Sequence, residues 1–95
     1  MSAIILESDL GIEAAIRLKT QLVPALTRRR QVVLNAAGVT RLHAAAMQIL
    51  VAFVRERGAA ARKTRIADPS PVMLAAAGAL GVTRLFCPHD QGAAQ

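Results

Sequence analysis

Three side chains of the sequence could act as soft metal ligands or as a nucleophile and its base: His43, Cys87 and His89. Cys87 and His89 are close enough in the chain to chelate a metal ion. A closed metal site needs three or four ligands, however, and the sequence places no further soft ligand beside this pair. We therefore interpret the pair as carrying no metal.

Motifs of enzymatic chemistry are absent from the sequence. It contains no glycine-rich phosphate loop, no paired carboxylates and no nucleophile elbow. We therefore expect a protein that is not an enzyme, with no catalytic residue, no metal and no cofactor.

Two polar residues stand at the ends of apolar segments. His43 precedes a helical pattern, where it could sense pH or contact a partner; we favour a loop or cap residue with a hydrogen-bonded ring. Asn35 follows a buried strand and could belong to a site. We favour a polar strand terminator that bonds the adjacent loop.

Asn35 and His43 both lie in the stretch from Gln31 to Arg57, which is predicted to form a strand, a loop and a helix. Residues 31–36 hold a short β-branched apolar run, which is typical of a strand buried on both faces of a parallel sheet. Gly38 marks the loop. Residues 44–57 are strong helix formers, and Gly58 is a good C-terminal stop.

The helix over 44–57 has two apolar faces. Met47, Leu50 and Val54 recur at helical spacing and carry the larger side chains, so we expect this face in the core. A helix on one side of a small sheet buries only one face. The neighbouring face, with Ala45 and Ile49, should therefore lie nearer the surface.

The remaining segments alternate in type along the chain. Residues 3–6 and 63–67 are strand candidates, and residues 12–29 form a helical pattern that Pro24 should kink or break. Ser70 is an N-cap candidate for a last helix that Gly81 can end. Such alternation predicts an α/β fold, with a mainly parallel central sheet of three or four strands and three main helices.

The order and spacing of these segments resemble the STAS domain family, the fold of anti-sigma factor antagonists. The resemblance covers roughly residues 3–86 and is carried by Val32-Val33-Leu34-Asn35, Gly38-Val39, Leu42 to Met47, Leu50, Ala67 to Pro71 and Leu80 to Phe86. Asn35 and His43 stand where the family usually has aspartates, and Ala44-Ala45 stand where it has a serine or threonine. Such domains usually have an extra N-terminal strand, which we expect the start of this chain to be too short to supply.

The resemblance implies a protein-interaction module of bacterial signalling. STAS antagonists bind a kinase-type anti-sigma factor through the loop and helix that begin at the serine, here loop 38–44 and helix 44–57, and phosphorylation of the serine breaks the complex. Since Ala44 and Ala45 have no hydroxyl, we expect no phosphorylation switch there. Gln48 resembles the chemotaxis-associated branch. The alternative is an anion-, small-ligand- or lipid-binding STAS subunit, such as a component of a lipid-transport complex.

We predict the partner surface at the start of this helix, where small side chains surround a polar centre and allow another backbone to approach closely. Its residues are Thr40, Arg41, His43, Ala44, Ala45, Gln48 and Ile49. A homodimer contact or an ordinary exposed alanine strip is the alternative.

The composition of the chain argues against a nucleic-acid-binding protein. Twelve Lys and Arg against six Asp and Glu give a net charge of +6, yet the chain has no Trp or Tyr and no nucleic-acid motif. We therefore interpret the cations, such as those of 28–30 and the helix-ending Arg55 and Arg57, as solvated helix ends rather than as a nucleic-acid site. An acidic protein partner is the alternative.

Other features of the sequence predict the cellular compartment of the protein and the bounds of its domain. One cysteine, no signal peptide and no apolar run long enough to span a membrane predict a cytoplasmic protein without membrane insertion. We expect one domain over residues 1–86 and a flexible C-terminal tail over 87–95.

Overall fold

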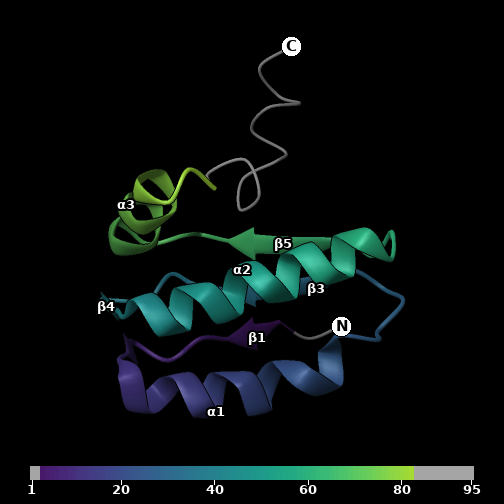
Figure 1. Cartoon of the computed structure of the whole chain (residues 1–95), viewed down its shortest axis with the longest axis horizontal. Coiled ribbons are helices and arrows are strands. Elements are labelled where there is room, and N and C mark those ends of the chain that lie inside the picture. Colours follow the sequence, from purple (N-terminus) through teal and green to yellow (C-terminus); the bar gives the residue numbers. More distant parts are fainter. Residues whose placement is uncertain (1–2, 83–95) are drawn as a thin grey trace.

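The computed structural model describes residues 3–82 and is organised around a three-stranded parallel sheet. Its strands are β1 (Ile4–Ile5), β3 (Val32–Asn35) and β5 (Thr64–Ala67), in the order β1-β3-β5. Leu34 lies opposite Ile4 on one side and Ile66 on the other. Figure 1 shows β1 and β5 running in the same direction, and β3 pairs parallel with both. The predicted α/β fold with a mainly parallel sheet is confirmed.

Helices connect and follow these strands. They are α1 (Ile12–Leu22), the 3-10 turn η1 (Val23–Ala25), α2 (Ala44–Ala59) and α3 (Pro71–Ala79). Pro24 lies inside η1, so the predicted break is confirmed, and α1 is shorter than the expected 12–29 because it ends before the proline.

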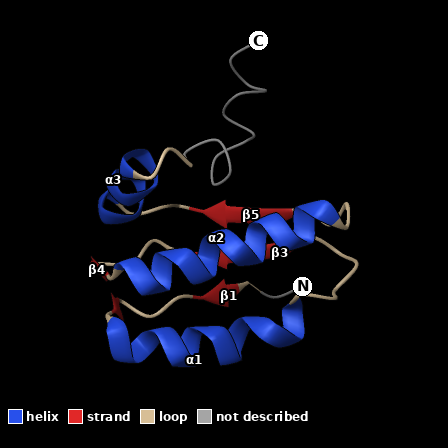
Figure 2. Cartoon of the chain, viewed as in Figure 1, coloured by secondary structure: helices blue, strands red, loops and turns tan. Residues whose placement is uncertain are grey.

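Both crossover helices lie on one face of the sheet, as Figure 2 shows. The strand order advances in a single direction, and right-handed crossovers then place α1 and α2 on the same side. Leu34, Val32 and Ile66 point to this side and are buried. The core therefore sits between the sheet and the α1–α2 layer.

The opposite face of the sheet is only partly covered. Along β3 burial alternates, with Val33 and Asn35 half-buried between fully buried neighbours. Ile5, which is in register with Asn35, is 71% exposed, and Arg65 is exposed too. The expectation of a strand buried on both faces is therefore wrong, because α1 and α2 both cover the same face.

Helix α2 buries the face that its spacing predicts. Met47, Leu50 and Val54 are in the core, joined by Phe53 from the neighbouring face. The helix passes through Gly58 and ends in a Schellman turn, in which Arg62 N–H donates to the Arg57 carbonyl at 2.8 Å. The left-handed position of this turn is Ala61, with φ of 60°. The prediction that Gly58 stops the helix is therefore wrong.

The last helix follows its local signals closely. The Ser70 hydroxyl accepts a hydrogen bond from Met73 N–H, and Pro71 is the first helical residue. Gly81 has φ of 71°, and Val82 folds back with its N–H on the Ala77 carbonyl at 2.8 Å. The predictions for residues 83–86 and for the tail 87–95 lie outside the described residues.

Two short strands were not expected from the sequence. β2 (Asp9–Leu10) and β4 (Arg41–Leu42) form a separate two-stranded parallel sheet. Asp9 lies opposite Arg41, and Leu10 lies opposite Leu42. This pair joins the connection before α1 to the connection before α2, where the predicted site lies.

Arg57 departs from its expected role as a solvated helix end. Its side chain is fully buried, and all five of its N–H groups have acceptors, at distances of 2.8–3.0 Å. The acceptors are the Thr64 hydroxyl and the main-chain carbonyls of Ala25, Arg28, Arg30 and Lys63. The prediction is wrong for this residue because the loops it joins wrap around the end of α2.

Candidate partner-binding site

The loop between β3 and α2 starts with a local turn. The Asn35 side-chain Oδ1 accepts a hydrogen bond from Ala37 N–H at 3.0 Å. Val39 N–H donates to the Ala36 carbonyl, and the Val39 side chain is buried. The interpretation of Asn35 as a strand terminator that bonds the adjacent loop is confirmed.

The next part of the loop is fixed to the β1–α1 connection through one carbonyl. The Ser8 carbonyl accepts from Thr40 N–H at 2.8 Å, from the Thr40 hydroxyl at 3.1 Å and from Arg41 N–H at 3.1 Å. His43 N–H then donates to the Leu10 carbonyl at 2.8 Å. The segment before α2 is thus held by main-chain contacts on both sides of β4.

His43 is the N-cap of α2. Its ring Nδ1 accepts a hydrogen bond from Ala45 N–H at 3.0 Å, so one free donor of the first turn is satisfied. The interpretation of His43 as a cap residue with a hydrogen-bonded ring is confirmed. The side chain is otherwise exposed and remains available to a partner.

The structure brings the predicted partner residues together on one continuous surface at the start of α2, which we call the entry surface. Five of them are exposed: Thr40, Arg41, His43, Ala44 and Gln48. Ala45 and Ile49 are half-buried and pack against the core. Their position near the surface agrees with the sequence analysis, while their role in binding remains a prediction.

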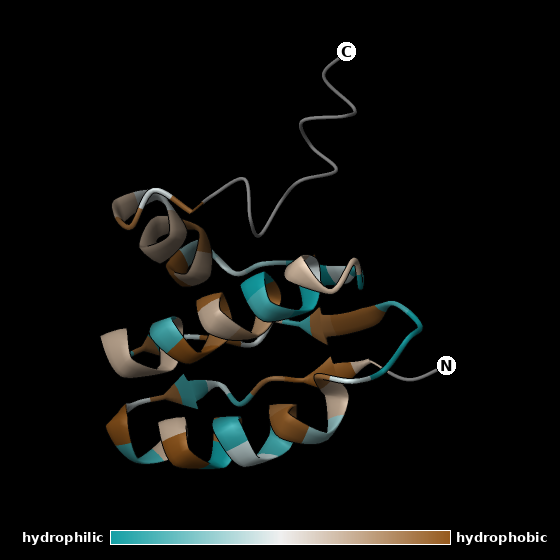
Figure 3. Ribbon diagram, turned by 45° about the vertical axis from the view of Figure 1, so that its right-hand side comes forward, coloured by the Kyte–Doolittle hydropathy of each residue, from teal (hydrophilic) through white to brown (hydrophobic). Residues whose placement is uncertain are grey.

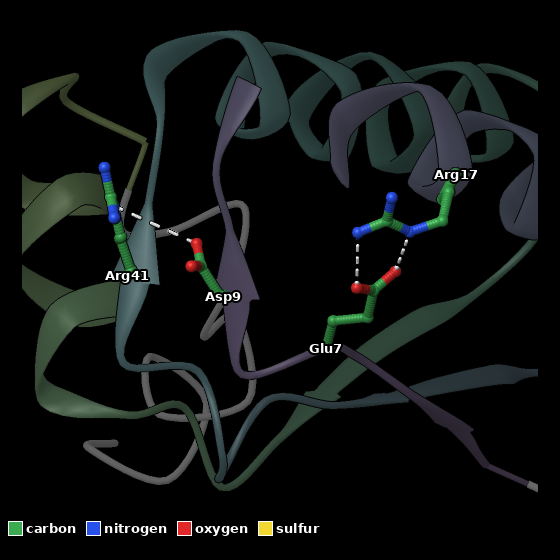
Figure 4. A network of polar contacts seen from close by, with 4 residues as sticks. All are labelled: Glu7, Asp9, Arg17 and Arg41. Carbon is green, nitrogen blue, oxygen red and sulfur yellow. Dashed lines mark hydrogen bonds and ion pairs between the residues drawn. The ribbon is translucent and has the colours of Figure 1, made fainter. Parts of the chain in front are cut away.

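A polar hollow of about 330 Å³ lies beside Arg41. Figure 4 shows its two ion pairs: Arg17 with Glu7, and Arg41 with Asp9. Arg17 donates to both carboxylate oxygens of Glu7, at 3.0 and 3.1 Å. In the second pair, the Nε of Arg41 lies 3.9 Å from the Oδ1 of Asp9. These hydrogen bonds lower the pKa of Glu7 and raise that of Arg17.

Sequence reasoning missed these neighbours of Arg41. The partner surface predicted from the sequence contains none of Glu7, Asp9 and Arg17. A signal was present, because residues that follow β1 and β3 in a parallel sheet must meet at the same edge. Asp9 and Arg41 both follow a strand of that sheet.

An apolar groove of about 320 Å³ adjoins the other side of the entry surface. It runs between α1 with η1 and α2, and Gln48 and Ile49 belong to both the groove and the entry surface. Lys19 and Glu56 supply its charged groups. Its remaining lining residues are Leu22, Val23, Leu26, Ala52 and Phe53.

The described residues contain neither a cluster of metal ligands nor a membrane-spanning helix. Between residues 3 and 82 no group of three His, Cys, Asp or Glu side chains could hold a metal ion. In the same range no helix has the length and apolarity to cross a bilayer. Cys87 and His89 lie outside the described residues.

A comparison with models of protein families gives a match over nearly the whole chain. A family model described as "Mlab, STAS domain" matches residues 2–87, which is nearly the whole chain. Comparisons with curated proteins and with solved structures give no match.

Proposed function

Because the chain belongs to the STAS domain family, we propose that it is a non-catalytic protein-interaction module of bacterial signalling. Its partner is a kinase-type or other signalling protein, in the manner of anti-sigma factor antagonists and chemotaxis-associated STAS proteins. The partner binds the loop 38–44 and the exposed side of α2, and no phosphorylated serine controls the complex.

The observation that carries this proposal is the rigid attachment of the entry surface. The Ser8 carbonyl holds Thr40 and Arg41, and His43 caps the helix that presents Ala44. A surface that is ordered before binding loses little conformational entropy when a partner docks. The exposed methyl group of Ala44 leaves room for a partner backbone to approach.

The entry surface offers a partner three kinds of contact. Arg41 provides a charge at the edge of the polar hollow, the His43 ring provides a hydrogen-bonding group, and Ile49 leads into the apolar groove. A partner that covers all three would bury an apolar centre with a polar rim, which is the usual composition of protein interfaces.

Affinity capture from the native cell followed by mass spectrometry tests the proposal. The baits are the parent chain, Ala44→Glu and the control Ala75→Glu, which places the same carboxylate on an exposed position of α3. A partner retained by the parent and by Ala75→Glu, but lost by Ala44→Glu, supports the proposal. Equal retention by all three baits contradicts it.

The apolar groove favours a second candidate function, binding of an anionic lipid or other small amphiphile. Its apolar walls suit a hydrocarbon chain, and Lys19 at its rim suits an anionic head. A thermal-shift screen with nucleotides and anionic lipids tests this function, because a ligand that binds only the folded state raises the melting temperature. A shift that Ala52→Glu removes would support it.

A further inference from the structure

The topology of the fold places a group of positively charged residues at one end of the molecule. In a parallel sheet with crossover helices, every helix-to-strand connection lies at the same end. Both such connections are basic: one carries Arg28, Arg29 and Arg30, and the other carries Arg62 and Lys63. Figure 3 shows the connection into β3 as a hydrophilic segment. We call these five residues the basic end.

Arg57 fixes the two connections side by side. Its Nη1 donates to the Arg28 carbonyl at 2.8 Å, and its Nη2 donates to the carbonyls of Arg30 and Lys63 at 3.0 and 2.8 Å. The guanidinium thus holds the main chain of both connections, while the side chains of the same residues stay free of it. Arg28, Arg30 and Lys63 are accordingly exposed.

Within residues 3–82 no carboxylate contacts Arg57, so its buried charge adds to that of the basic end. Burial lowers the pKa of Arg57, and the nearby charges of Arg62 and Arg28 lower it further. Four of the acidic residues between positions 3 and 82 belong to the opposite end, since they follow a strand or begin a helix: Glu7, Asp9, Glu13 and Asp68. The fifth, Glu56, lines the apolar groove.

We propose that the basic end is a docking surface for an anionic phospholipid bilayer, which it contacts through lipid phosphates without inserting. Four of its five cations are arginines, whose guanidinium forks match phosphate oxygens in bidentate geometry. A charged bilayer attracts each nearby cation independently and needs no pocket. The polar hollow lies at the opposite end, and the apolar groove approaches the basic end at Leu26 and Glu56 but is lined by none of the five cations, which agrees with a broad planar partner.

Two other polyanions fit the same observations less well. Single-stranded nucleic acid is held by aromatic stacking, and Phe53, the one aromatic residue within 3–82, is buried. An acidic peptide gains specificity from side-chain pockets beside its charged contacts, and none of the five cations lines either described hollow. Duplex DNA and an acidic peptide therefore enter the experiment as competitors.

Docking through the basic end leaves the entry surface free. The start of α2 and the residues 40–43 lie at the opposite end of the molecule, because helices and strands run in opposite directions in this fold (Figure 1). A bilayer-bound domain would thus present the entry surface to a protein partner. The docking itself does not depend on the function proposed above.

Sedimentation with vesicles tests the inference on the whole chain. The vesicles contain phosphatidylcholine alone or mixed with phosphatidylglycerol, at low salt and at about 0.15 M salt, where the Debye length is about 8 Å. The test variant is Arg28→Gln/Arg30→Gln. The matched control, Arg17→Gln/Arg41→Gln, removes the same charge from the opposite end. Circular dichroism checks that both variants fold.

The parent chain should sediment with the anionic vesicles only, and salt should weaken its binding. The test variant should bind about thirtyfold more weakly, because each cation near an anionic surface contributes about 1 kcal/mol. The control should lose much less. The inference is overturned if the parent fails to bind, if both variants lose affinity equally, or if duplex DNA or poly-glutamate displaces the protein from the vesicles at equal charge concentration.

Discussion

The guanidinium Nη1 of Arg57 lies 2.8 Å from the main-chain carbonyl of Arg28, so two arginines 29 positions apart in the chain are joined through a hydrogen bond. The same side chain bonds carbonyls before β3 and before β5 and stacks over Phe53 with its guanidinium carbon 5.8 Å from the ring centroid. Arg57 therefore links both helix-to-strand connections to the end of α2.

Replacing Arg57 by lysine should destabilise the fold strongly. A lysine ammonium has three donors instead of five and cannot span carbonyls from both connections, so buried acceptors lose their partners. We expect Arg57→Lys to lower the free energy of unfolding by about 2–3 kcal/mol in a urea titration. The exposed neighbour Arg55→Lys should change it by less than about 0.5 kcal/mol. Equal effects of the two substitutions would contradict this role of Arg57.

The Arg57 network also shows what the sequence could not reveal. The elements of the fold were predictable because their signals are local, as with Ser70 and Gly81 at the two ends of α3. Whether an arginine at the end of a helix meets water or carbonyls depends on loops that are distant in sequence. Helical spacing places Arg57, unlike the exposed Arg55, on the face of Leu50 and Val54. Which carbonyls its guanidinium meets there depends on the wrapping of the two connections.

The candidate site was predictable to a similar degree. The exposed position of Gln48 was predictable because helix periodicity places it opposite Leu50 and Val54, whereas the binding role of the entry surface stays a prediction. Asp9 and the pairing of β2 with β4 were missed because two-residue strands carry no periodicity of their own. The contact between Ser8 and Thr40 is likewise tertiary.

The C-terminal end of α2 provides a paired test of backbone preference. Gly58 lies inside the helix with nothing within 4 Å of an added Cβ, so Gly58→Ala should stabilise the protein by about 1 kcal/mol. Ala61 has φ of 60°, so Ala61→Gly should stabilise it by about 0.5–1 kcal/mol. Urea titrations measure both changes, and a loss of stability in either variant would disagree with the described C-terminal turn.

Stability should fall in acid partly through Glu7. The hydrogen bonds from Arg17 lower the pKa of Glu7 in the folded state, so their stabilising effect is present above the unfolded pKa of about 4.3 and is lost as the pH falls through the folded pKa. In Glu7→Gln this component is absent. Thermal melts below pH 5 should therefore show a smaller decline for Glu7→Gln than for the parent, and parallel declines would argue against the pair.

Phosphorylation should not control binding at the start of α2. Ala44 and Ala45 have no hydroxyl, and the hydroxyl of the nearby Thr40 donates to the Ser8 carbonyl. The parent chain should therefore bind the captured partner with the same affinity before and after treatment with the cognate kinase. A phosphate detected on Thr40 by mass spectrometry, together with loss of binding, would refute this prediction.

The most direct test of the entry surface is the dissociation constant of Ala44→Glu for the partner that affinity capture identifies. Ala44 is exposed in the first turn of α2, where a carboxylate suits the helix dipole, so the fold should be retained. Placed within an interface, the same carboxylate is buried without a partner charge and costs several kcal/mol. We expect titration calorimetry to show roughly hundredfold weaker binding than that of the parent and of Ala75→Glu. Binding as tight as the parent's would show that the partner docks elsewhere.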